Sequence, residues 1–126
     1  MKIYLASPLF TEYERENVIA SAKDLRRQGH EVYVPMEHQI EDGWNLTNNE
    51  WARRVFKEDI KAINWCDCVY CLYYGLYSDS GTAWECGYAY GIGKEVVVFD
   101  YANEEVSLMV IQGASNKNQF AYKAQT

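Results

Sequence analysis

The chain has 126 residues, of which 48% are hydrophobic and 24% charged, and its 18 acidic and 12 basic side chains give a net charge of −6. Such a composition is typical of one globular domain with a single core, so we expect one domain over residues 1–126. The acidic balance argues against binding DNA or RNA polymers, which needs a basic surface. Since no apolar run approaches the roughly 20 residues that span a bilayer, no membrane contact is expected.

The amino-terminal segment, Met1 to Ser7, has the character of a first strand and lacks the apolar region of a signal peptide. We therefore expect a cytoplasmic protein whose four cysteines stay reduced. Three of them, Cys66, Cys68 and Cys71, lie in an apolar run, and their spacing is not the paired Cys-x-x-Cys pattern of zinc sites. We expect no metal.

Apolar runs and helical patterns alternate along the chain. Two segments, Thr11 to Glu14 and Thr47 to Glu50, fit the Thr-x-x-Glu capping box that starts a helix. In chain order we expect a strand at 2–6, a helix at 11–28, a strand at 31–34, a polar loop at 36–46, a helix at 47–64, a strand at 67–72, a helix beginning at residue 82, a strand at 95–99, a short helix at 107–111 and a final strand or arm at 120–122.

Strands that alternate with helices predict a three-layer α/β domain of flavodoxin-like (Rossmann-like) type with a mostly parallel five-stranded sheet. In such sheets ligands bind beyond the carboxyl ends of the strands, near the point where the strand order reverses. The segments expected at that edge are 7–10, 36–43, 73–85 and 100–107.

Glu85 stands out because it follows a turn and opens the helix that begins near Thr82. One interpretation is structural: Thr82 to Glu85 fits the capping box, in which the glutamate only satisfies a backbone donor. The other is catalytic, since a carboxylate near the positive end of a helix dipole stays ionised and is suited to act as a nucleophile.

Other motifs do not suggest a cofactor. Gly87, Gly91 and Gly93 lie within or at the end of a helix, whereas a dinucleotide fingerprint lies between a strand and its helix. What remains is carboxylate chemistry. A pair of carboxyl groups in one cleft suits glycosidic bond cleavage, in which one attacks the anomeric carbon and the other, kept protonated, delivers a proton to the leaving group.

Four segments in order resemble the nucleoside 2-deoxyribosyltransferase family: Lys-Ile-Tyr-Leu-Ala-Ser-Pro-Leu-Phe at 2–10, Pro-Met-Glu-His-Gln at 35–39, Val-Phe-Lys-Glu-Asp-Ile at 55–60 and Asp-Ser-Gly-Thr-Ala-Trp-Glu-Cys-Gly at 79–87. The resemblance covers nearly the whole chain through Met109. It implies transfer of a 2-deoxyribosyl group between nucleobases with retention, on deoxyribonucleosides and free nucleobases. It also implies a homo-oligomer with a shared active site.

The resemblance also implies roles for single residues. Glu85 is the expected nucleophile, Tyr4 hydrogen-bonds and orients it, and Asp59 faces the base as proton donor and acceptor. The expected substrate-binding residues are Asp79, which binds the sugar hydroxyl, Gln39, which holds the base, Phe10, which stacks on the base, Ser107 and Gly81.

Two departures from the family pattern leave alternatives open. Ser107 stands where the family has an asparagine that reaches the sugar site of a neighbouring subunit, and the chain lacks the family's aromatic terminus. Related deoxynucleoside 5′-monophosphate N-glycosidases, which hydrolyse rather than transfer, also have serine at the position of Ser107. They tend to have serine in place of Asp79 too, and a carboxylate there repels a phosphate, so we favour unphosphorylated nucleosides. A non-catalytic nucleoside-binding domain is the third alternative.

Overall fold

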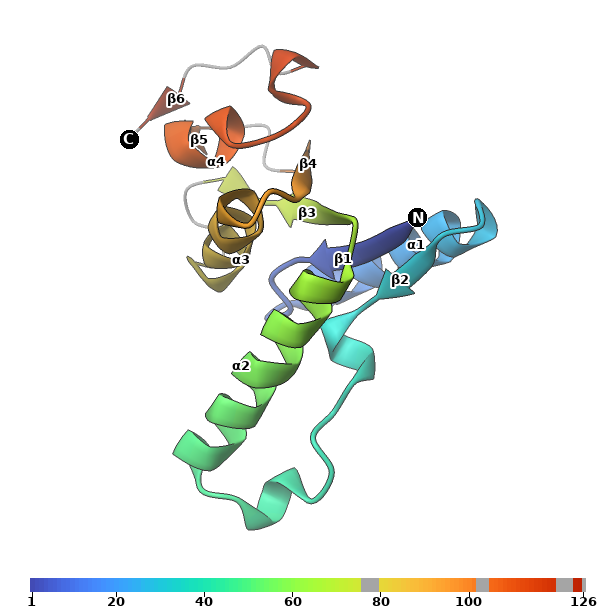
Figure 1. Cartoon of the computed structure of the whole chain (residues 1–126), viewed down its shortest axis with the longest axis vertical. Coiled ribbons are helices and arrows are strands. Elements are labelled where there is room, and N and C mark those ends of the chain that lie inside the picture. The colour runs from blue at the N-terminus through green and yellow to red at the C-terminus, as the bar shows by residue number, and fades with distance from the viewer. Residues whose placement is uncertain (76–79, 102–104, 120–123, 126) are drawn as a thin grey trace.

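In the computed structural model, residues 1–75, 80–101, 105–119 and 124–125 are described, and four strands among them form one parallel sheet (Figure 1). The elements in chain order are β1 (Lys2–Ala6), α1 (Glu12–Arg27), β2 (Glu31–Tyr33), the 3-10 turns η1 (Pro35–Glu37) and η2 (Gly43–Asn45), α2 (Asn48–Trp65), β3 (Cys68–Tyr73), α3 (Ser80–Gly91), β4 (Glu95–Asp100), β5 (Val106–Ser107), α4 (Leu108–Gln112), η4 (Lys117–Gln119) and β6 (Ala124–Gln125).

The sheet has the strand order β2-β1-β3-β4, with every neighbouring pair parallel. This is the beginning of the flavodoxin-like order, in which the chain leaves β1 first to one side and then to the other. The reversal falls between β1 and β3, where Tyr4 pairs with Val69, while on the other side Tyr4 pairs with Tyr33. Tyr4 therefore lies in the middle of the sheet.

Helices cover both faces of this sheet. Because side chains alternate along a strand, Ile3 and Leu5 of β1 point to one face and Tyr4 and Ala6 to the other. The first face packs against Val18, Ala22 and Leu25 of α1. The second face packs against α2 and α3 through Ala62, Ile63, Cys86 and Ala89. The three-layer, flavodoxin-like α/β class predicted from the sequence is thus confirmed.

The first helix begins as its sequence predicts. The Thr11 side chain accepts a hydrogen bond from the Glu14 backbone, and the Glu14 carboxylate accepts one from the Thr11 backbone, which completes a capping box. At α2, Thr47 Oγ1 accepts a hydrogen bond from the Glu50 N–H at 3.1 Å.

The helix that carries Glu85 starts earlier than predicted. It begins at Ser80, so Thr82 lies inside it and is not its cap, and Glu85 falls in the second turn. The capping-box interpretation of Thr82 and Glu85 is wrong for this reason. A position in the second turn also weakens the argument from the helix dipole, which acts mainly within the first turn.

The carboxyl-terminal part differs from the predicted five-stranded sheet. Among the described residues the main sheet has four strands, and β5 instead pairs in parallel with β6 in a separate two-stranded sheet. The strand or arm expected at 120–122 lies outside the described residues.

Much of α2 extends away from the sheet, together with the segment that carries η1 and η2 (Figure 1). Only Ala62 and Ile63, near its carboxyl end, are buried, whereas Trp51 and Phe56 are about half exposed. The segment and the helix form an arm beside the carboxyl edge of the sheet. No helix in the described part of the chain combines the length and apolar character that crossing a bilayer requires.

Candidate active site

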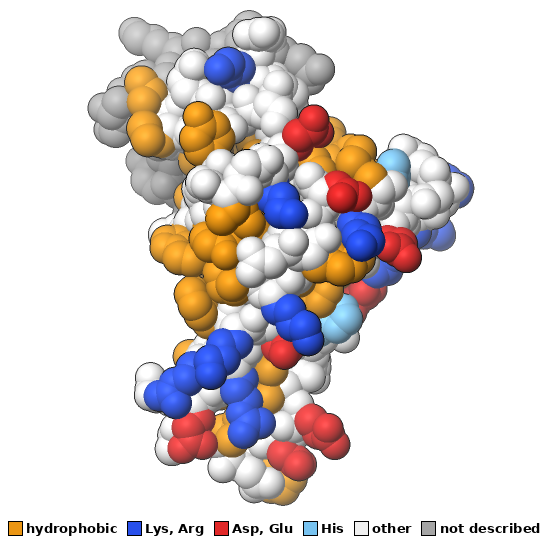
Figure 2. All heavy atoms as spheres, in the orientation of Figure 1, with side chains coloured by type: hydrophobic (Ala, Val, Ile, Leu, Met, Phe, Trp, Pro, Cys, Tyr) orange, Lys and Arg blue, Asp and Glu red, His pale blue; other side chains and the backbone are white. Residues whose placement is uncertain are grey.

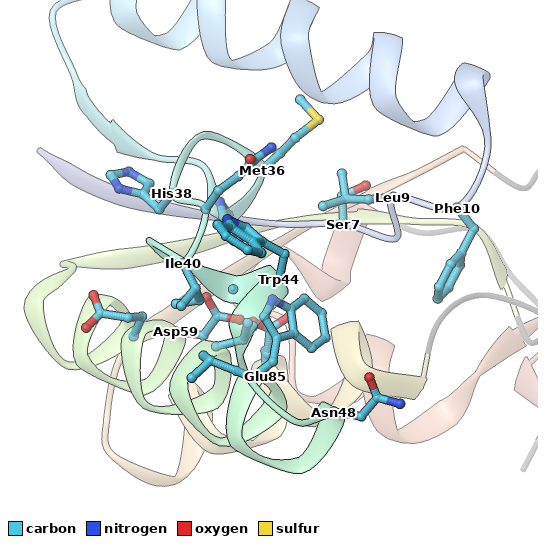
Figure 3. Close-up of a pocket in the computed structure, with 17 residues that line it drawn as sticks. Ser7, Leu9, Phe10, Met36, His38, Ile40, Trp44, Asn48, Asp59 and Glu85 are labelled. Atoms are coloured by element: carbon cyan, nitrogen blue, oxygen red, sulfur yellow. The ribbon is translucent and has the colours of Figure 1, made fainter.

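A cleft of about 870 Å³ lies between the carboxyl end of β1 and the arm that contains α2. Its walls come from the segment after β1, the η1–η2 segment, α2 and α3. Figure 3 shows Ser7 and Phe10 on the first of these, Ile40 and Trp44 on the second, and Asp59 and Glu85 deeper in the cleft. This is the edge of the sheet at which ligands are expected in the fold.

Glu85 is held by a side chain from the centre of the sheet. The hydroxyl of Tyr4, a fully buried residue, donates a short hydrogen bond to Oε2 of Glu85. Burial and the negative charge of Glu85 raise the pKa of Tyr4 far above its usual value near 10, so the phenol keeps its proton. A donated O–H stabilises the ionised carboxylate and fixes its orientation.

Asp59 provides a second carboxyl group in the same cleft. It lies on α2, is half-buried, and lines the cleft with Glu85. Burial and, to a lesser degree, the neighbouring Glu58 raise the pKa of Asp59 to about 6. A carboxyl group with that pKa can both donate and accept a proton near neutral pH.

Asp59 and Glu85 also line a second hollow of about 580 Å³ between α2 and α3. Gly81 and Trp84 of α3 contribute to its walls, as does Phe56 of α2. The two carboxyl groups thus lie where two hollows adjoin. This arrangement offers space for a two-part ligand, with one part on each side of the carboxyl groups.

An aromatic column stands behind the Tyr4–Glu85 pair. The ring of Tyr33 stacks on Tyr4 with 5.6 Å between centroids, and on its other side the imidazole of His38 stacks at 4.1 Å with the planes 6° apart. His38 itself lines the cleft. The column connects the centre of the sheet with the cleft wall formed after η1.

The residues expected to hold the base lie in this cleft. Gln39 lines it from the segment after η1, and Phe10 lines it from the segment after β1. The Phe10 ring is 74% exposed, while its backbone is fixed by hydrogen bonds from its N–H to Glu14 and from Arg15 to its carbonyl. An exposed ring on a fixed backbone is available to stack on a planar ligand.

The residues expected near the sugar are distributed differently. Gly81 lines the second hollow. Ser107 lies on β5 outside the first cleft, and its N–H donates a hydrogen bond to the Tyr73 hydroxyl at 2.9 Å. Asp79 lies outside the described residues.

Trp44 is a cleft residue that the sequence analysis did not single out. It lies on η2, lines the cleft, and has 84% of its surface exposed. The signal was available, because Trp44 lies in the polar loop at 36–46, where a large exposed aromatic residue needs an explanation. In the described part of the chain, no group of three or more His, Cys, Asp or Glu side chains is placed to hold a metal ion.

Comparison with known proteins identifies the family of this chain. A family model described as nucleoside 2-deoxyribosyltransferase matches residues 3–120. Among solved structures, a 2-deoxyribosyltransferase from the psychrotolerant bacterium Bacillus psychrosaccharolyticus is 37% identical, with a TM-score of 0.81 over 99% of this chain and 87% of that chain. A search of curated proteins found no match.

Two more distant structures share the fold. A conserved protein from Enterococcus faecalis V583 is 24% identical, with a TM-score of 0.66 over 94% of this chain and 70% of its own. The CMP N-glycosidase BcmB from Clostridium botulinum is 19% identical, with a TM-score of 0.66 over 90% of this chain and 80% of its own. Since the family model spans nearly the whole chain, this protein belongs to the nucleoside 2-deoxyribosyltransferase family.

Proposed function

We propose that this protein transfers a 2-deoxyribosyl group from one nucleobase to another, through a covalent bond between the sugar and Glu85. One observation carries the proposal: the Tyr4 hydroxyl holds one oxygen of Glu85 in a cleft that also contains Asp59, whose pKa is raised to about 6. Membership of the family supports the same chemistry.

In the first half of the reaction, Oε1 of Glu85 attacks the anomeric carbon of the nucleoside. The bond from that carbon to the base nitrogen breaks, and protonated Asp59 delivers its proton to the departing base. The electron pair of the broken bond thus leaves on a neutral base. Tyr4 keeps Oε2 occupied, which presents Oε1 to the sugar.

In the second half, an acceptor base enters the place that the first base has left. Asp59, now ionised, takes a proton from the acceptor, whose nitrogen attacks the anomeric carbon and releases Glu85. Two displacements on one carbon give overall retention. The pKa of Asp59 near 6 suits a group that must give a proton in one half and take one in the other.

The base and the sugar use different parts of the site. Gln39 holds the base, and Phe10 and Trp44 offer exposed rings for stacking. Asp79 and Gly81 serve the sugar. A carboxylate at Asp79 accepts a hydrogen bond from a free 5′-hydroxyl but repels a 5′-phosphate, because both groups are negatively charged.

A homo-oligomer with a shared active site is part of the proposal. Ser107 lies outside the cleft of its own chain, which fits a role in the sugar site of a neighbouring copy. Apolar side chains gather over α3 and its junction with α2 (Figure 2). Trp84 and Phe56 are about half exposed there, and their ring centroids lie 5.4 Å apart. Such a surface is suited to association between subunits. Sedimentation that finds an active monomer contradicts this part.

The deciding experiment incubates the protein with deoxyinosine, with and without free cytosine, and separates the products by chromatography. New deoxycytidine is the expected result. Free deoxyribose and hypoxanthine in both samples favour the N-glycosidase alternative, in which water replaces the acceptor base; Ser107 is the residue that keeps this alternative open. No reaction in either sample overturns the proposal.

Substrate choice is tested by comparing deoxyinosine with its 5′-monophosphate. The nucleoside is expected to react faster, and Asp79→Ser is expected to narrow the difference. Faster reaction of the monophosphate with the unmodified protein contradicts the role given to Asp79.

A further inference from the structure

The hydroxyl of Tyr33 is a buried polar group that the proposed mechanism does not use. Less than 1 Å² of its oxygen is accessible, and it has no hydrogen-bond partner among the described residues. Buried hydroxyl groups almost always have a partner, so one without a partner calls for an explanation. The arrangement around Tyr33 supplies one.

The sheet fixes the direction in which Tyr33 points. Tyr33 pairs with Tyr4 in the register of β1 and β2, so both side chains lie on the same face of the sheet. The Tyr4 ring packs on one side of Tyr33 and His38 on the other, which leaves the ring little freedom. The face they share is the one that α2 covers.

Asp59 is the nearby group on α2 that also lacks a partner. It makes no hydrogen bond among the described residues. Asp59 lines the cleft, whereas Tyr33 does not. The two groups are close enough to affect each other: burial, then the charges of Asp59 and Glu58, raise the pKa of Tyr33 to about 12. The buried hydroxyl of Tyr33, on the sheet, and the carboxyl group of Asp59, on α2, thus belong to the same sheet–helix interface.

We propose that Tyr33 is a positioning residue for Asp59, to which its hydroxyl donates a hydrogen bond when the base occupies the cleft. This inference rests on the proposed function, because it assigns Asp59 the task of proton transfer. Tyr33 does not reach the ligand, since its oxygen is shielded from the cleft. It acts only through Asp59.

The hydrogen bond fixes which oxygen of Asp59 carries the proton. In the neutral acid, the carbonyl oxygen accepts from Tyr33 and the other oxygen holds the proton that faces the base. As the base departs, that proton moves to the base nitrogen, and the carboxylate left behind still accepts from Tyr33. Tyr33 keeps its own proton throughout, as its high pKa requires.

The effect of the Tyr33 hydroxyl on the pKa of Asp59 must be separated from the effects of the other groups that face Asp59. These are Glu58 on the same helix, Glu85 on α3, Tyr4 on β1, Tyr33 on β2 and His38 after η1. A donor to the carboxylate favours its ionised form, opposite to the effect of burial and of Glu58. Loss of the Tyr33 hydroxyl is therefore expected to raise the pKa of Asp59, whereas general loosening of the cleft exposes Asp59 to water and lowers it.

The test is Tyr33→Phe, which keeps the ring and its two stacking contacts. The expected result is a fall in kcat of about tenfold from lost orientation, with KM for the donor nucleoside little changed. The alkaline limb of kcat, which reports the complex with the base bound, is expected to move up by about one pH unit. Tyr70→Phe is the matched control, because Tyr70 lies on β3, packs on the opposite face of the sheet, and is half-buried as well.

Two further measurements keep the inference testable if Tyr33→Phe folds poorly or if the proposed function fails. Incorporating 3-fluorotyrosine at position 33 makes a stronger donor and is expected to move the limb to lower pH. Carbon-13 NMR titration of the Asp59 carboxyl group, with a free nucleobase bound in the cleft, reports its pKa without any reaction. An Asp59 pKa that is unchanged in Tyr33→Phe overturns the inference; a normal pKa response in a protein that exchanges no bases overturns only the proposed function.

Discussion

Tyr4 and Glu85 are joined by a hydrogen bond although 81 positions separate them in the chain. One comes from the central strand and the other from the second turn of α3. The bond gives Glu85 a fixed orientation, which is a property that a nucleophilic carboxylate needs.

Glu85→Ala removes the nucleophile, and we expect base exchange to fall by more than about 10³-fold while the fold survives. The measurement is chromatography of the exchange products, with circular dichroism to verify folding. Glu95→Ala, at the amino end of β4, is the control and should retain activity. Exchange at the unmodified rate in Glu85→Ala contradicts the assignment.

Tyr4→Phe leaves the ring in the core and removes only the donor to Glu85. We expect kcat to fall by about 10²-fold, a loss comparable to that of one preorganised donor in other enzymes. Steady-state kinetics measure the effect. Because the carboxylate also loses a buried partner, the variant should unfold at a lower temperature than the unmodified protein. An unchanged kcat means that the bond has no part in catalysis.

Glu58→Gln removes the negative charge beside Asp59, and a like charge favours the protonated acid. The pKa of Asp59, about 6 in the unmodified protein, should therefore fall, and the alkaline limb of kcat/KM should move to lower pH by about half a unit. The measurement is a pH profile of donor cleavage. Glu31→Gln, at the amino end of β2, should leave the profile in place; a shift of the same size there points to net charge rather than proximity.

Asp59→Asn should make the protein more stable and less active. The folded-state pKa of Asp59 lies about 2 units above its usual value of 3.8, so its neutral form is favoured by folding. The contribution of the neutral Asp59 to the free energy of unfolding is fully present below pH 3.8 and is lost as the pH rises through 6. With solvent screening considered, we expect Asp59→Asn to gain about 1–2 kcal/mol in the free energy of unfolding at pH 7.5.

Urea unfolding of both proteins at pH 7.5 and well below pH 3.8 measures this difference. The gain should disappear at the lower pH, where the aspartate is neutral in both folded and unfolded states. A gain of equal size at both values implies a packing effect rather than relief of a buried charge.

The sequence was sufficient for features that depend on nearby residues. The capping box at Thr11 formed as predicted, and the alternation of strands and helices led to the observed layers. The start of α3 was misplaced because the box at Thr82 has the right spacing, but the helix already runs through Ser80. A local pattern cannot show that the residues before it also become helical.

Features that depend on contacts between distant residues were not predictable from patterns. The pairing of the two-residue strands β5 and β6 leaves no periodic signal in such short segments. The position of the Tyr33 ring between Tyr4 and His38 was not predictable either, because it depends on strand register. The resemblance named Tyr4, Asp59 and Glu85, but the hydrogen bond from Tyr4 and the burial of Asp59 required the fold.

The arm formed by α2 and the η1–η2 segment has a consequence for how the two sides of the cleft tolerate change. Tyr4 is fully buried on β1, a strand with a neighbour on each side, so freeing it requires nearly global unfolding, and its amide should be among the slowest to exchange hydrogen. Trp44 and Trp51 lie on the arm, where side chains are largely exposed. Substitutions there cost little stability, so the choice of base can diverge during evolution while the nucleophile stays in place.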